Sequence, residues 1–63
     1  MGYDVTDYNA TTGEKTGAYE VNLDRMPAPK VNTVRKVRNN QTDEVKWILP
    51  SGVVSPIKPR GLH

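Results

Sequence analysis

The segment from Val34 to Ile57 constrains the fold more than any other part of this 63-residue chain. Apolar and β-branched residues recur along it, and two groups of turn-forming residues, Asn39-Asn40 and Pro50-Ser51-Gly52, divide it into three runs. Short runs of this kind between turn residues are typical of β-strands joined by hairpins. The segment therefore predicts three consecutive antiparallel strands, which we expect to form a meander over residues 33–58.

The later of these turns predicts a definite strand pairing. Residues 50–52 suit a three-residue hairpin loop, because proline favours the start of a type I turn and glycine accepts the left-handed position that closes it. This loop places Leu49 opposite Val53. It also places Trp47 opposite Ser55.

For the earlier turn, a five-residue loop over residues 39–43 is predicted. It pairs Arg38 with Glu44 and places Arg35 across from Trp47. A four-residue loop would put Arg35 opposite Lys46, and like charges on opposite strand positions are unfavourable. We therefore expect a cation and an aromatic ring to lie side by side at Arg35 and Trp47.

The first half of the chain predicts a further hairpin over residues 2–23. From Tyr19 to Asp24, apolar residues alternate with polar and mainly acidic ones, which is the period of a strand with one buried face. The partner strand, Tyr3 to Tyr8, is less regularly patterned. Small polar residues and a glycine over 9–15 suit the turn between them. A proline-containing connector, residues 25–30, and a tail, residues 59–63, complete one domain spanning 1–63.

Composition agrees with an all-β fold. Eight valines, two isoleucines and six threonines outweigh three leucines, while five glycines and five prolines supply turns. About five antiparallel strands are expected, as a strongly bent sheet or as a small barrel of SH3-like or OB-like size. A short helix over Val31, Val34 and Val37 is the alternative for that segment, although β-branching makes it a weak helix former.

Several classes of function are not expected. A chain this short buries only roughly 60% of its unfolded surface, which leaves little room for an enzyme pocket. The sequence has no cysteine, and its one histidine, His63, is the last residue. Ser51 and Ser55 therefore lack an internal histidine base, and we expect no catalytic residue, no cofactor and no metal. No apolar run approaches a membrane span, so a cytoplasmic protein without a membrane partner is expected.

Charge is unevenly distributed along the chain. Residues 1–24 carry five acids and one base, whereas residues 25–63 carry eight bases and two acids. If the two halves fold against each other, part of this charge will be neutralised internally. Only the remaining charge is then available to an outside partner.

Five residues form the predicted partner-binding site, namely Arg35, Lys36, Arg38, Lys46 and Trp47. A basic sheet surface with an aromatic ring can hold phosphates and stack a base, or it can dock on a protein. The competing interpretation is structural: the bases solvate the sheet and protect its edges, while Trp47 fills a core that contains no phenylalanine.

Three hypotheses about function follow. The first is a non-enzymatic protein that docks on another protein, such as an inhibitor or adaptor of host machinery made by a phage or other mobile element. The second is a nucleic-acid-binding module that uses the same five residues. The third is a structural subunit of a homo-oligomer, since association would supplement a small core.

Overall fold

The computed structural model describes residues 2–28 and 30–62 and shows one antiparallel sheet of five strands in that part of the chain. The strands are β1 (Tyr3–Asn9), β2 (Lys15–Val21), β3 (Thr33–Asn39), β4 (Val45–Ile48) and β5 (Val54–Ser55). A single 3-10 turn, η1 (Leu23–Arg25), follows β2. The predicted all-β fold of about five antiparallel strands is confirmed. Pro29 in the predicted connector and His63 in the predicted tail lie outside the described residues.

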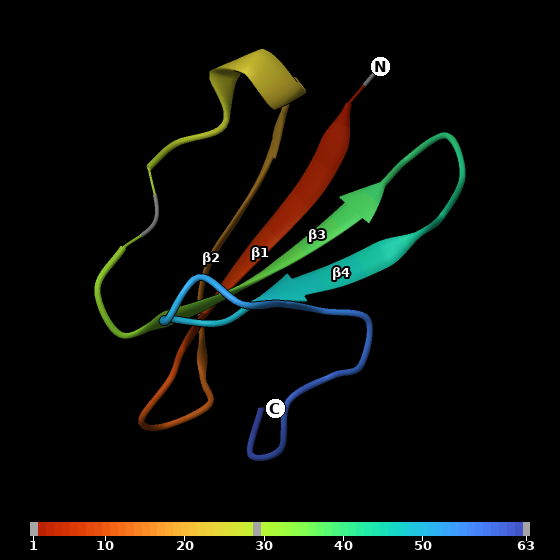
Figure 1. The fold of residues 1–63 in the computed structure, drawn as a ribbon. Coiled ribbons are helices and arrows are strands. Elements are labelled where there is room, and N and C mark those ends of the chain that lie inside the picture. Colours follow the sequence, from red (N-terminus) through yellow and green to blue (C-terminus); the bar gives the residue numbers. More distant parts are fainter. Residues whose placement is uncertain (1, 29, 63) are drawn as a thin grey trace.

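The strands lie in the order β2-β1-β3-β4-β5, so β1 and β3 pair in the interior of the sheet (Figure 1). Within the described residues β2 and β5 form two separate edges, which makes this an open sheet and not a closed barrel. The interior position of β1 explains its irregular pattern. Val5 and Asp7 are buried on one face of the sheet and Tyr8 on the other, so neither face of this strand is wholly polar.

The β1–β2 and β3–β4 turns have the same construction. In each, an asparagine Oδ1 accepts hydrogen bonds from the N–H groups two and three residues ahead: Asn9 from Thr11 and Thr12, and Asn39 from Gln41 and Thr42. The fourth loop residue, Gly13 or Asp43, has a positive φ of 78° or 62°. Both loops follow the pattern Asn-x-x-Thr-Gly/Asp-Glu and start 30 residues apart.

This turn chemistry decides the β3–β4 register. The Asn39 N–H donates to the Glu44 carbonyl, which leaves a four-residue loop over 40–43. The five-residue loop predicted over 39–43 is therefore wrong, and so is the four-residue alternative with Arg35 opposite Lys46, because the asparagine cap and the left-handed Asp43 place the loop over 40–43. Lys36 lies opposite Trp47, and Arg35 lies opposite Ile48. The predicted neighbours Arg35 and Trp47 are on different faces.

The β4–β5 hairpin has the predicted three-residue loop. The Leu49 N–H donates to the Val53 carbonyl at 2.9 Å, Gly52 has a φ of 92°, and Trp47 lies opposite Ser55. β5 ends at Ser55, since Pro56 has no N–H to continue the ladder. The helix considered over residues 31–37 does not form, because most of that segment belongs to β3.

The 30-residue offset extends from the turns to the strands that carry them. The Ala10 N–H donates to the Asn32 carbonyl at one end of the β1–β3 pair, and the Asn40 N–H donates to the Gly2 carbonyl at the other. The second contact is equivalent to the first: its donor residue is 30 positions later in the chain, and its acceptor residue is 30 positions earlier. The two hairpins are thus arranged about an approximate twofold axis between β1 and β3. A bulge in the β1–β2 pairing between Asp7 and Tyr8 makes their outer strands differ.

Each face of the sheet is covered by a segment without regular strands. On one, which we call the tail face, Tyr8, Val34 and Trp47 form the apolar core, and Leu62 from the tail packs against them. The rings of Tyr8 and Trp47 are 5.8 Å apart at their centroids. Trp47 is only 6% exposed, which agrees with the interpretation that this residue fills the core. The opposite face, which we call the connector face, carries Val5, Asp7 and Arg35, and the connector contacts it where Pro27 and Ala28 meet Arg35.

Replacing Gly13 by alanine tests the shared turn. Because Gly13 has a φ of 78°, we expect Gly13→Ala to lower the free energy of unfolding by about 1 kcal/mol or more. Gly17→Ala is the matched control: Gly17 lies within a strand, and an added Cβ there meets nothing within 4 Å. Chemical denaturation measures both. Equal losses for the two variants would contradict this account of the turn.

Candidate functional site

The five predicted site residues do not share one surface. Side chains alternate along a strand, so Arg35 and Lys46 lie on the connector face, whereas Lys36, Arg38 and Trp47 lie on the tail face. Arg35 is 5% exposed and Trp47 is the buried aromatic of the tail-face core. The structure therefore brings Lys36 and Trp47 together and separates Arg35 from both.

Arg35 is the centre of a buried polar cluster. Its Nε donates to Asp7 Oδ1 at 3.1 Å, and Asp7 is 1% exposed and directly opposite it on β1. Its Nη1 donates to the Pro27 carbonyl at 2.8 Å, and its Nη2 donates to the Ala28 carbonyl at 3.4 Å. This one guanidinium thus neutralises the Asp7 carboxylate and attaches the connector to the sheet.

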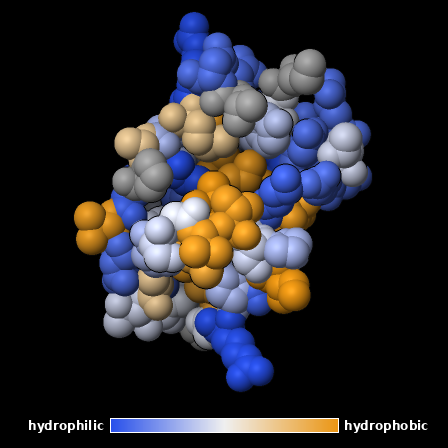
Figure 2. All heavy atoms as spheres, in the orientation of Figure 1, coloured by the Kyte–Doolittle hydropathy of each residue, from blue (hydrophilic) through white to orange (hydrophobic). Residues whose placement is uncertain are grey.

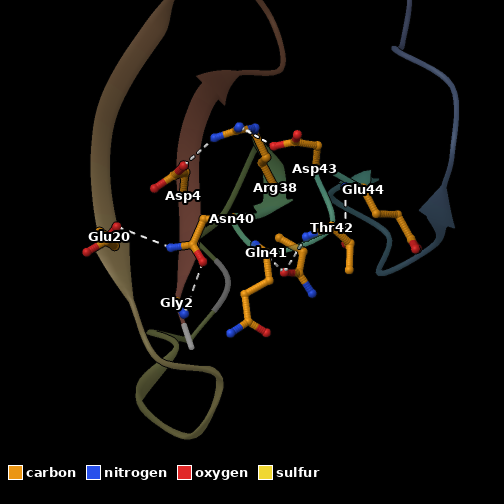
Figure 3. Close-up of polar contacts among 10 residues, drawn as sticks. Gly2, Asp4, Glu20, Arg38, Asn40, Gln41, Thr42, Asp43 and Glu44 are labelled. Carbon is orange, nitrogen blue, oxygen red and sulfur yellow. Dashed lines mark hydrogen bonds and ion pairs between the residues drawn. The ribbon is translucent and has the colours of Figure 1, made fainter.

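Arg38 is held between two carboxylates at the opposite end of the β1–β3 pair (Figure 3). Its Nη1 donates to Asp4 Oδ2 at 2.7 Å, and its Nη2 donates to Asp43 Oδ1. On β4, Lys46 Nζ lies 3.3 Å from Glu44 Oε1. These pairs are partly or largely exposed, and each contributes little to stability. They nevertheless neutralise two of the predicted site's four bases, Arg38 and Lys46.

Asn40 ties the β3–β4 turn to the first hairpin. Its Nδ2 donates to Glu20 Oε2 at 3.3 Å, and its Oδ1 accepts from the Gly2 N–H at 3.4 Å, as Figure 3 shows. An added Cβ on Gly2 would lie 2.8 Å from Asn40 Nδ2, so only a residue without a side chain fits this contact unchanged. The arrangement joins the β3–β4 turn to β2 and to the start of the chain described.

Lys36 makes the cation–ring contact that had been predicted for Arg35. Its Nζ lies 5.8 Å from the Trp47 ring centroid. Within residues 2–28 and 30–62, Lys36 is the one base of the predicted site without a carboxylate partner. Internal neutralisation of the two oppositely charged halves, which the charge distribution led us to expect, therefore occurs along β1 and β3.

A wide groove with a mainly apolar lining lies on the connector face. It encloses about 530 Å³ and is lined by Tyr3, Met26, Val37, Asn39, Glu44, Lys46, Ile48 and Val54. Figure 2 shows hydrophobic residues gathered in the middle of the molecule and hydrophilic residues around them. Val54 lines the groove and is still 56% exposed. The groove thus opens directly onto exposed apolar surface.

Sequence reasoning missed this groove because of the register error. A shift of one residue in β3 exchanged Val34 with Val37, which placed Val37 on the Trp47 face and Val34 beside Ile48. The repeated Asn-x-x-Thr-Gly/Asp-Glu pattern would have given the correct loop, since the first copy has the glycine that marks the left-handed position. Met26, which lies between two turn-forming elements, carried no comparable signal.

Two buried polar atoms in the described residues lack a hydrogen-bond partner, Asp7 Oδ2 and Tyr19 Oη. Both belong to the connector face, where Tyr19 lies on β2 beside Asp7. Burial raises the pKa of Tyr19 above its ordinary value of 10.0, and the negative charge of Asp7 raises it further, against a smaller opposing effect of Arg35. The phenol is thus held in its neutral form.

Other site chemistries are not found in the described part of the chain. No group of three or more histidine, cysteine or acidic residues is placed to hold a metal ion there. No helix among residues 2–28 and 30–62 is long and apolar enough to cross a membrane. Comparison with protein-family models, with curated proteins and with solved structures found no match. The groove and the polar clusters are therefore interpreted from their own geometry.

Truncating the buried ion pair tests its role. Removing one partner of such a pair leaves the other charge buried, so Asp7→Ala and Arg35→Ala should each lower the free energy of unfolding by about 3 kcal/mol or more. Asp4→Ala and Arg38→Ala remove the exposed pair on the same two strands and should each cost less than about 1 kcal/mol. Denaturant titration followed by Trp47 fluorescence measures all four. Similar losses at both pairs would contradict the assignment.

Tyr19 predicts how stability depends on alkaline pH. Folding raises the pKa of Tyr19, so the unfolded chain loses the phenol proton at a lower pH than the folded chain does. The contribution of the neutral phenol to stability is therefore complete below pH 10.0, and it is lost as the pH rises through the folded-state pKa. As the pH is raised from 9.5, we expect the free energy of unfolding to fall less for Tyr19→Phe than for the parent. Tyr3→Phe is the control. Identical alkaline profiles for the parent and Tyr19→Phe would refute the coupling.

Proposed function

We propose that this chain is a non-enzymatic protein that docks an apolar segment of another protein into its connector-face groove, and that it acts as an inhibitor or adaptor of that partner. The observation that carries the proposal is the groove itself, where apolar side chains from the connector and from β3, β4 and β5 line a surface that opens to solvent. Exposed apolar surface of this kind is often an interaction site.

The lining indicates the chemistry of the occupant. Met26, Val37 and Ile48 offer apolar contacts, and methionine adapts its shape readily to a partner. The two charged residues at the groove, Glu44 and Lys46, pair with each other and leave no net charge to satisfy. An uncharged segment with aliphatic or aromatic side chains therefore matches the groove better than a charged ligand.

The surroundings favour a protein over a small molecule as the occupant. Val53 and Ile57, close to Val54 in the chain, are also exposed, so the segment around β5 offers further apolar surface. A protein segment can cover both the groove and these neighbouring residues. A small molecule of the size of the groove would leave them in water.

Nucleic-acid binding has less support than docking on a protein. Such binding needs unpaired bases along one surface, with affinity that falls steeply as salt rises. Of the predicted basic residues, Arg35 is buried, and Arg38 and Lys46 have carboxylate partners. A surface of one lysine over a buried tryptophan offers one phosphate contact and no exposed ring for stacking.

Capture from lysate with two matched variants tests the proposal. Val54→Asp places a charge in the groove, whereas Val31→Asp makes the same change at a residue that is 95% exposed and outside the groove. A partner recovered by the parent should bind Val54→Asp at least about tenfold more weakly, because a buried valine contributes about 1.5 kcal/mol or more. It should bind Val31→Asp as tightly as the parent.

The affinities are measured by calorimetry with the identified partner, after circular dichroism confirms that both variants are folded. Equal binding by the parent and Val54→Asp would refute docking in the groove. Binding of generic DNA or RNA that falls steeply with salt and survives Val54→Asp would support the nucleic-acid alternative instead.

A further inference from the structure

Strand β2 is an edge strand whose outer side is unoccupied in the described structure. Its seven residues pair with β1 on one side, and no backbone hydrogen bond joins its other side to any segment of residues 2–28 and 30–62. The strand has no proline, and residues 16–19 carry no charge. An open edge of this composition is a template for another strand, because alternate N–H and C=O groups point outward.

We propose that the strand which occupies this edge is β2 of a second copy of the chain. The two strands pair antiparallel about a twofold axis at Ala18, and the two five-stranded sheets join into one. Three features of the β2 sequence favour its own copy as the partner: the positions of its charges, the glycine next to its central residue, and the tyrosine two residues after that glycine.

The charged residues of β2 are placed so that those of one copy can attract those of a second copy. Lys15 is at one end of the strand and Glu20 is near the other, and both are exposed. With Ala18 on the axis, Lys15 of each copy lies opposite Val21 of the other copy, one position from Glu20. The attraction between the two charges therefore occurs twice, and opposite charges near each other on neighbouring strands favour this arrangement over a parallel one.

Gly17 and Tyr19 form a second self-complementary pair. Both face the connector side of the sheet, since they lie opposite Asp7 and Val5 of β1. The space above Gly17 is open, because an added Cβ there meets nothing within 4 Å. With Ala18 on the axis, Tyr19 of each copy lies opposite Gly17 of the other. An aromatic ring packed across a strand from a glycine covers backbone that the glycine leaves bare.

The proposed dimer does not depend on the groove. No residue of β2 lines the groove, so both surfaces are available at once. A contact made by one short strand from each copy is small, which predicts a weak dimer that forms at high concentration and stabilises a small core by mass action.

Sedimentation equilibrium of the full chain, from micromolar to millimolar concentration, tests the proposal. The parent should shift from 7.0 kDa toward twice that mass as concentration rises. Ala18→Glu places two like charges together on the axis and should weaken association at least about tenfold. Ala10→Glu makes the same change at an exposed residue of the β1–β2 turn and should associate like the parent.

A charge exchange tests the orientation of the strands. Lys15→Glu and Glu20→Lys should each weaken the dimer, and the double variant should recover it, because the exchange restores both contacts. A parent that stays at 7.0 kDa at millimolar concentration would overturn the proposal. Association that survives Ala18→Glu but is abolished by Val54→Asp would also overturn it, since the groove would then be the interface between copies.

Discussion

The buried pair of Asp7 and Arg35 is the interaction on which the connector face depends. Both residues are at interior strand positions, and their burial is tolerated because each side chain neutralises the other. Arg35 then uses its two remaining nitrogens to bind two connector carbonyls. Among the described residues 22–28, Pro27 and Ala28 are the ones hydrogen-bonded to the sheet, and Arg35 makes both contacts. The position of Met26, and with it the wall of the groove, follows from the pair.

The same two strands explain why the charge asymmetry of the sequence does not produce a basic binding surface. β1 carries acids and β3 carries bases, and antiparallel pairing sets Asp4 opposite Arg38 and Asp7 opposite Arg35. The opposite charges thus stabilise the association of the two hairpins, which is a role inside the fold. What the sheet leaves exposed is an apolar groove, and for this reason the proposed partner is an apolar protein segment and not a polyanion.

The fold class and two of the three hairpin loops could be predicted from the sequence, because alternation and turn residues are local properties. The alternation predicted a strand over residues 19–24, and β2 does contain its first half but ends at Val21, before η1. Pro50, Ser51 and Gly52 specify their own loop. The β3–β4 register could not be derived from charge pairing, since the side chain of Asn39 and the left-handed Asp43 fix it. That single-residue shift separated Arg35 from Trp47, and it changed which face each predicted site residue occupies.

Other features depend on contacts between distant parts of the chain. The pairing of β1 with β3 brings together residues 24 to 36 positions apart, and nothing in the local pattern of Tyr3–Tyr8 indicates an interior strand. The repeat of the two turns was visible in the sequence, and it would have suggested equivalent hairpins. The groove requires the connector, whose path is fixed by Arg35 and not by its own residues.

The hydrogen exchange rate of the Arg35 Nε–H, measured by nuclear magnetic resonance, tests this account most directly. The buried pair with Asp7 predicts a resolved Arg35 Nε–H signal that exchanges much more slowly than those of the exposed Arg25 and Arg60. An Arg35 signal that exchanges as fast as those two would contradict the account, because the connector would then lack its attachment and the groove its wall.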